Sequence, residues 1–363
     1  MRVLVAVDAW GRWSSAQVGT AVARAWARLG AEVALVPVAS AGAGFTRAWA
    51  DLRHARLDHE VVAGTSVGVV EDPATCLLAP ELAVADPVGH GDHAPDPRRW
   101  EVSSRVLADI LGRRVWGGAS LGSTAGEPGR EVLLELVDAP WRDGGAGWVE
   151  AWDDARDPVA SRGPGSGGGG RLTLVTSAEQ AGAQCTGLRG IVSLEGRAEG
   201  MDPAKMLALD ERLVVLAERL TGDRQAGTVP GSGACGGLGL AVQALGGRVV
   251  TGPEALLECA GARDSVRRAD LVVTGCEHFD FGSMGGEVVS EVTALAGEAG
   301  VPVVAVCSTA EVASRELREH GIEAAQPVGS PPHRDGHAHG RDPDAFMAWL
   351  DEACLPVART WTW

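Results

Sequence analysis

The chain is organised around the segment Val229-Pro-Gly-Ser-Gly-Ala-Cys-Gly-Gly-Leu-Gly-Leu240, in which five of twelve residues are glycine. Glycine allows positive φ and close approach of the backbone to another group. Residues 241–245 continue as a short helix, so the loop and the helix start would together present N–H groups to an anion, with phosphate as the natural ligand. The alternative is a close helix crossing that needs glycine only for room. Both interpretations stay open at this point.

Two other nucleotide motifs are disfavoured. Gly231 to Gly236 fits G-x-G-x-x-G, but that dinucleotide fingerprint requires a strand directly before it. The preceding regular element is instead a helix predicted over 202–220, and residues 225–229 are at best a weak strand. A Walker A loop needs a lysine, and Lys205 is the only lysine of the chain.

Composition limits the class of protein. With 363 residues, the chain has room for about two domains. A net charge of -16 argues against nucleic acid or an anionic membrane as a partner. Seven scattered cysteines indicate buried thiols in a reducing compartment and no zinc site. The first apolar run is too short for a signal peptide or a membrane span, so we expect a cytoplasmic protein.

Both ends of the chain alternate between strands and helices. A strand over 2–7, a helix capped by Ser14 or Ser15 and closed by Gly30, and a strand over 33–38 form one βαβ unit. Its ligand side is expected where the strands end, at 8–15 and 39–45. Further elements are predicted in the rest of the chain: helices over 103–111, 202–220, 253–260, 286–299 and 344–352, and strands over 114–116, 172–175, 248–250, 270–273 and 301–307.

Several short patterns carry weaker signals. Gly118 to Gly122 matches G-x-S-x-G, but no helix follows the serine as a nucleophile elbow requires. The histidine groups at 90 and 93 and at 333–339 could hold a metal, although a solvated loop is the better interpretation. The glycine-rich stretch 163–170 is typical of a linker or surface loop.

The order of the motifs resembles the bacterial glycerate kinase family over nearly the whole chain. Two blocks are specific: Pro-Gly-x-Gly-Ala-x-Gly-Gly-Leu-Gly at 230–239 and Asp-Leu-Val-Val-Thr-Gly-x-x-x-x-Asp at 270–280. Three others match in part: the strand ending in Asp8 with a serine pair, the turn with Gly42 and Gly44, and the turn at 120–123.

The resemblance implies an α/β fold with two α/β domains. One is a Rossmann- or flavodoxin-like, doubly wound parallel sheet built from both chain ends, 1–65 and 265–363, and the other is an inserted domain, 66–264. It further implies ATP and Mg²⁺ as cofactors and phosphoryl transfer to D-glycerate in the cleft between the domains. We allow for a homodimer.

The resemblance also suggests roles for individual residues. The catalytic residues would be Asp8, Asp280 and Arg12, and the metal ligands Glu127 and Asp280. The nucleotide and phosphate would contact Gly231, Gly233, Gly236, Gly237, Ser123, Thr274 and Gly275. The substrate would contact Ser15, Ser40, Gly42, Gly44 and Arg189.

The sequence departs from the family pattern at charged positions. Gly11, Glu199 and Glu287 stand where the family has lysine, and Ser40 and Ala43 replace two carboxylates. Losing one cation at a phosphoryl-transfer site commonly costs about two to three decades in rate. Arginines such as Arg12, Arg189 and Arg197 can replace lysine as phosphate partners. The rival hypotheses are a catalytically degenerate ligand-binding or interaction protein and a kinase of another small hydroxy acid.

Overall fold

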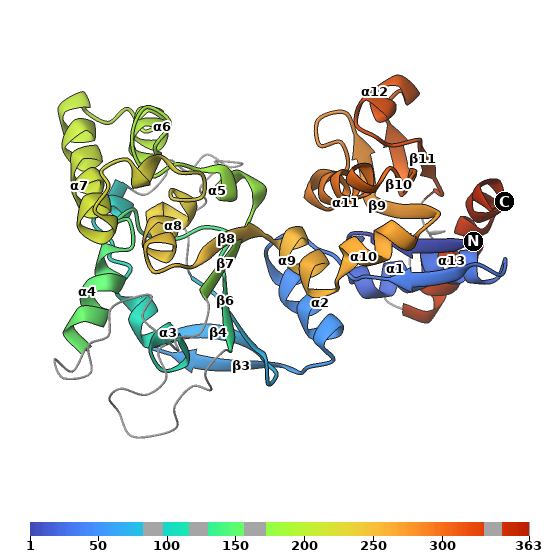
Figure 1. Ribbon diagram of the computed structural model, residues 1–363, viewed down its shortest axis with the longest axis horizontal. Helices are drawn as coiled ribbons and strands as arrows, with labels where there is room; N and C mark the ends of the chain where they lie inside the picture. The colour runs from blue at the N-terminus through green and yellow to red at the C-terminus, as the bar shows by residue number, and fades with distance from the viewer. Residues whose placement is uncertain (83–96, 116–129, 156–171, 330–342, 363) are drawn as a thin grey trace, which may run out of the picture. The chain divides into compact units, whose positions relative to one another are not determined.

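The computed structural model describes residues 1–82, 97–115, 130–155, 172–329 and 343–362, and these form two compact units (Figure 1). Unit 1 combines residues 1–54 and 252–363, and unit 2 is residues 55–251. Ser123 and Glu127, the G-x-S-x-G stretch, the histidine groups and the linker at 163–170 lie outside the described residues.

Unit 1 is built on a parallel five-stranded sheet with the order β11-β10-β9-β1-β2. Its strands are β1 (Arg2–Val5), β2 (Glu32–Leu35), β9 (Leu271–Asp280), β10 (Val303–Glu311) and β11 (Ala324–Pro327). Its helices are α1 (Ser15–Ala27), α2 (Ala43–Arg53), α9 (Gly252–Cys259), α10 (Ala262–Arg268), α11 (Gly286–Ala299), α12 (Ser314–Glu319) and α13 (Pro343–Trp361). Strands from both chain ends therefore share one sheet.

Helices cover both faces of this sheet. One face packs Val3 and Val5 against residues of α1 and α13, such as Trp26 and Leu350. The other face packs against α10 and α11. Alternating side chains of β1 therefore enter two different cores, as the buried run of a parallel strand predicts. The predicted doubly wound sheet built from both chain ends is confirmed.

Local signals fixed several helix ends. The Ser14 hydroxyl accepts a hydrogen bond from the Gln17 N–H at 3.3 Å, and the Gln17 side chain accepts one from the Ser14 N–H at 3.0 Å. This capping box starts α1 where the sequence predicted it. The Asp202 carboxylate likewise accepts hydrogen bonds from the Ala204 and Lys205 N–H groups at the start of α7 (Pro203–Thr221).

Unit 2 contains a mixed six-stranded sheet in which the strands follow their order in the chain. They are β3 (Leu57–Val62), β4 (Thr65–Glu71), β5 (Thr75–Pro80), β6 (Glu131–Glu135), β7 (Leu172–Thr176) and β8 (Arg248–Thr251). The first three strands pair antiparallel, and β5 to β8 pair parallel. The inserted α/β domain from the middle of the chain is thus also confirmed.

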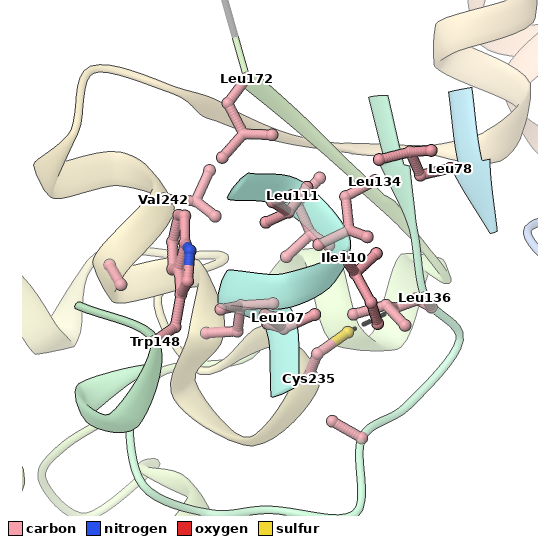
Figure 2. Close-up of a cluster of buried hydrophobic side chains, with 14 of the residues drawn as sticks. Leu78, Leu107, Ile110, Leu111, Leu134, Leu136, Trp148, Leu172, Cys235 and Val242 are labelled. Atoms are coloured by element: carbon pink, nitrogen blue, oxygen red, sulfur yellow. Dashed lines mark hydrogen bonds between the residues drawn. The ribbon is translucent and has the colours of Figure 1, made fainter. Parts of the chain in front are cut away.

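Helices complete unit 2. They are η1 (Pro97–Trp100), α3 (Val106–Val115), α4 (Ala146–Ala155), α5 (Ala178–Gly182), α6 (Ile191–Ala198), α7 (Pro203–Thr221), η2 (Ala226–Thr228) and α8 (Ala234–Ala244). Figure 2 shows part of the core, in which Leu107 of α3, Leu134 of β6 and Trp148 of α4 belong to the same buried cluster as Cys235.

Several local predictions differ from the structure. The strand predicted over 114–116 is wrong, because α3 continues through Val115. The weak strand considered over 225–229 is a short 3₁₀ helix, η2, so no strand directly precedes the glycine-rich segment. β9 does not end at Val273 but runs to Asp280, because β10 pairs with it as far as Glu311.

The boundaries between the units are 54/55 and 251/252, whereas the sequence suggested 65/66 and 264/265. The difference has a physical reason. β3 pairs with β4 along its whole length, which places residues 57–62 in the sheet of unit 2. At the other boundary, Leu257 of α9 and Ala262 of α10 enter a core of unit 1.

Candidate functional site

The candidate site lies at the carboxyl ends of β1 and β9 in unit 1. The chain passes from β1 to β2 on one side of β1, and β9 occupies the other side. This reversal is a topological switch point, where open α/β sheets bind ligands. The Asp8 N–H donates to the Gly275 carbonyl at 2.9 Å, which fixes Asp8 at this point.

Asp8 is the most perturbed carboxyl group of the site. The pKa of Asp8 is raised from 3.8 to about 6, mainly by burial; a hydrogen bond from the Ala9 N–H opposes this rise, and the nearby Glu287 carboxylate adds to it. That hydrogen bond, at 2.7 Å, favours the charged form. A carboxyl group of this kind exchanges a proton near neutral pH.

Two glutamates accompany Asp8 at positions related to the family's lysines. Glu287 stands at one position where the resemblance predicts a lysine. Glu277 Oε2 lies 3.6 Å from the place where a Cβ on Gly11 would be, so its carboxylate occupies the space beside the second lysine position. Carboxylates therefore lie at or beside two positions where the resemblance predicts cations.

Asp280 is partly buried and organises the turn before α11. Its carboxylate accepts hydrogen bonds from the Ser283 N–H at 2.8 Å and from the Ser283 hydroxyl at 3.0 Å. The bond from the Ser283 N–H is the main cause that lowers the pKa of Asp280, so this carboxylate stays ionised. The turn continues through three residues with positive φ, Met284, Gly285 and Gly286.

The sequence did not single out Glu277 or His278 as site residues. The extension of β9 carries both of them beyond the end of β1. His278 Nδ1 lies 3.0 Å from the Thr309 hydroxyl on β10, and its Nε2 lies 3.9 Å from Glu277 Oε1. In the sequence, the polar pair Glu277-His278 was the feature that could have indicated these residues. Their position in space depends on the pairing of β9 with β10.

Thr274 and Gly275, predicted to contact nucleotide, lie inside β9. Thr274 is fully buried, and a Cβ on Gly275 would collide with the Val306 carbonyl oxygen on β10. Close strand packing accounts for this glycine. The nucleotide-binding role of both residues stays a prediction.

The other predicted site residues of unit 1 lie at helix starts and turns. Arg12 is exposed, and Ser15 is buried at the start of α1. Gly42 caps α2 with φ 121°, a value that glycine adopts readily. Ser40 is partly buried in the turn before that cap, and Gly44 is exposed in the first turn of α2.

The glycine-rich segment of unit 2 is buried from Gly231 to Val242. A Cβ on Gly233 would collide with the backbone of Gln184, one on Gly236 with the Trp141 carbonyl oxygen, and one on Gly237 would lie 2.8 Å from Gly144 Cα. The close approaches allowed by these glycines are therefore made by the protein's own backbone.

The N–H groups of this segment are also engaged. Ser232 and Ala234 donate to carbonyls within the segment, Gly233 donates to the Ala183 carbonyl, and the Cys235 N–H donates to the Gln180 side chain at 2.8 Å. Close packing, one of the two alternatives that the sequence left open, therefore explains these glycines. Phosphate binding by Gly231, Gly233, Gly236 and Gly237 stays a prediction.

Glu199, at the third lysine position, takes part in an ion-pair network of unit 2. Its carboxylate pairs with Arg99 and accepts a hydrogen bond from Trp100 Nε1 at 2.8 Å. Arg99 also pairs with Glu195 at 3.0 Å. Arg189 and Arg197, the arginines considered as replacements for lysine in this unit, are both exposed.

Within the described ranges, no three His, Cys, Asp or Glu side chains gather closely enough to hold a metal ion. None of the helices in these ranges is long and apolar enough to cross a membrane.

The fold defines the class: a two-domain α/β protein with a doubly wound sheet formed from both chain ends. A solved structure assigned as glycerate kinase 2 of Salmonella typhimurium matches 99% of this chain and 98% of its own, with a TM-score of 0.66 and 19% identity. The sequence model of the glycerate kinase family matches residues 174–355, half of the chain. The chain belongs to the glycerate kinase family.

Individual relatives are distant. An uncharacterised protein of Mycobacterium bovis is 26% identical over 90% of this chain and 83% of its own length. A glycerate kinase of Bacillus subtilis is 24% identical over 99% of both chains, and a glycerate 2-kinase of Escherichia coli is 24% identical over 89% of both. The expected resemblance to a divergent member of this family is confirmed.

Proposed function

We propose that the protein transfers a phosphoryl group from Mg-ATP to a hydroxyl of D-glycerate. Family membership and the relatives named glycerate kinase support this reaction class. The observation that carries the proposal is Asp8, a carboxyl group at the sheet's switch point whose pKa is raised to about 6. A base with this pKa accepts a proton efficiently near neutral pH.

In the proposed reaction, the hydroxyl oxygen of glycerate forms a bond to the γ-phosphorus as the bond to the β–γ bridging oxygen breaks. ADP leaves with that electron pair, and the hydroxyl proton passes to the Asp8 carboxylate. Asp280 is the weaker candidate for proton acceptor, because Ser283 engages both of its oxygens and the pKa is lowered. Asp280 instead holds the turn before α11.

The residues of the site fit Mg²⁺ by the chemistry of their donors. Mg²⁺ binds carboxylate oxygens and is usually held by one or two of them together with water and substrate phosphates. Glu277 and Asp280 supply such oxygens, and the Asp8 carboxylate is left to accept the proton. When bound, Mg²⁺ neutralises charge on the phosphates.

A catalytically degenerate, ligand-binding protein is the second candidate. It is favoured by the carboxylates of Glu277 and Glu287 at or beside two lysine positions, and by the ion pairing of Glu199 at the third. A kinase of another small hydroxy acid remains the third, because Ser40 and Ala43 make the turn before α2 less polar.

The experiment is ADP release from Mg-ATP by the purified protein, with and without D-glycerate. The proposal predicts glycerate-dependent release. If a folded protein, checked by circular dichroism, releases no ADP with glycerate, a panel of other small hydroxy acids tests the third candidate. Absence of release with every acceptor would leave the binding protein, and calorimetry with ATP would measure its affinity. A homodimer, a cytoplasmic location and a site between the two units stay predictions.

A further inference from the structure

A pocket of about 540 Å³ lies within unit 2, between α4, α6 and α7. Its volume is in the range that small-molecule sites occupy. The apolar residues that line it include Trp100, Ala146, Val192, Leu209, Leu213 and Leu216. Four of these, Trp100, Val192, Leu213 and Leu216, are buried core residues of the unit. The pocket therefore has a rigid apolar floor.

Six charged side chains also line the pocket, and most of them are satisfied by the protein. Arg142 Nε donates to Glu195 Oε2 at 2.6 Å, and Arg142 also donates to the carbonyls of Ala139 and Trp141. The Asp143 carboxylate accepts four hydrogen bonds, two from Ser104 and one each from the Gly145 and Gly147 N–H groups.

The charges on α4 and α7 are paired in the same way, with one exception. Glu150 pairs with Arg219 at 3.8 Å, and Glu211 pairs with Arg224 at 2.7 Å. The Arg212 side chain makes no ion pair or hydrogen bond to another residue in the part of the chain that the structure describes. The pocket therefore has one positive charge without a counter-ion.

We propose that this pocket binds an amphipathic monocarboxylate, with its apolar chain on the floor and its carboxylate at Arg212. Guanidinium groups bind carboxylates through two parallel hydrogen bonds, and the apolar floor supplies surface to be buried. An apolar amine would place a second positive charge beside Arg212, and a neutral chain would make no charge-assisted hydrogen bond with it. This site is separate from the switch point of unit 1 and does not depend on the kinase activity.

The spacing of the pocket residues along α7 places them on a single surface. Ala208, Arg212, Val215 and Arg219 line the pocket at intervals of three or four residues, which places them on one face of the helix. Val215 is 51% exposed at this face, so the pocket opens to solvent. A ligand can therefore enter without moving the core.

Isothermal titration of the full chain with decanoate, below its aggregation concentration, tests the proposal. We expect saturable binding with one site, about tenfold or more weaker after Arg212→Gln, because a charge-assisted hydrogen bond is lost. Ala208→Trp, at an exposed position of the wall, should block the chain and abolish binding while circular dichroism stays unchanged. Arg318→Gln, on α12 of unit 1, is the matched control and should bind like the parent.

Several outcomes would overturn the proposal. They are no saturable decanoate binding by the parent protein, equal binding of decylammonium, and unchanged decanoate affinity in both pocket variants. Concentration-dependent dimerisation that Ala208→Trp removes, in a protein that does not bind decanoate, would instead assign this face to a second copy of the chain. Each result is independent of whether the protein phosphorylates glycerate.

Discussion

At the residue scale, the environment of Asp8 decides the chemistry of the candidate site. The residue is partly buried beside Glu287, and both effects disfavour its charged form. Because the folded-state pKa is raised, the folded protein binds this proton more tightly than the unfolded chain. Stability from this group is therefore present at low pH and is lost as pH rises from about 4 to about 6.

Asp8→Asn is expected to lower the rate of glycerate-dependent ADP release by about two to four decades, because the variant has no carboxylate to accept the proton. It should also stabilise the folded protein by up to about 3 kcal/mol above pH 6, because no buried charge remains. Urea denaturation between about pH 5 and pH 8 measures the difference between the variant and the parent. A difference that shrinks as pH rises would contradict the raised pKa.

Glu287→Lys is expected to raise the rate of ADP release by about tenfold or more, since a cation near the transferring phosphoryl group stabilises its developing charge. It would also lower the pKa of Asp8 by replacing a like charge with an opposite one. The control is Glu291→Lys, one turn further along α11. Equal rates for both variants would show that position 287 has no special relation to the site.

At the element scale, the glycine-rich segment shows how glycines let a helix start pack closely against the protein's own backbone. Cys235, Gly236 and Gly237 all have positive φ, so α8 begins with a left-handed turn. Figure 2 shows the Cys235 side chain directed into the core, where its thiol donates to the Leu136 carbonyl at 3.4 Å. The thiol also lies 3.6 Å from the Thr176 hydroxyl at the end of β7, so it contacts residues at or just after the ends of β6 and β7.

Gly236→Ala is expected to lower the free energy of unfolding by about 3 kcal/mol or more. The new Cβ would collide with the Trp141 carbonyl oxygen at a backbone φ of 69°. The matched control is Gly297→Ala in α11, where no atom lies within 4 Å, and alanine should change stability by less than about 1 kcal/mol. Equal denaturation midpoints for the two variants would remove the packing explanation.

At the scale of the whole molecule, the two units differ in how the chain builds them. Unit 2 is one continuous stretch, Ala55–Thr251, with its own sheet and core. Unit 1 needs β1 and β2 from the first part of the chain and β9, β10 and β11 from the last part. The insertion therefore interrupts a sheet whose strands pair across more than two hundred residues.

A fragment of residues 55–251 is expected to fold by itself, because its strands and core residues all lie within that stretch. Circular dichroism during urea denaturation should show one cooperative transition. A fragment of residues 252–363 is the control, and it should not fold cooperatively, because β9 would lack its partner β1. A non-cooperative transition for residues 55–251 would mean that unit 2 depends on unit 1.

The sequence by itself determined the elements whose signals are local. The capping box at Ser14, the Asp202 cap and the apolar periodicity placed α1, α7 and α11 close to their observed bounds, and the alternation of strands and helices gave the α/β class. These signals act between residues a few positions apart, so they can be read without the fold.

Only the tertiary structure decided the electrostatics of the site and the role of the glycines. Glu277 lies beside Gly11, and Trp141 lies against Gly236, although the members of each pair are far apart in the chain. The length of β9 likewise depends on pairing with β10. Burial, charge proximity and backbone contact are properties of neighbours in space, and residue spacing along the chain does not contain them.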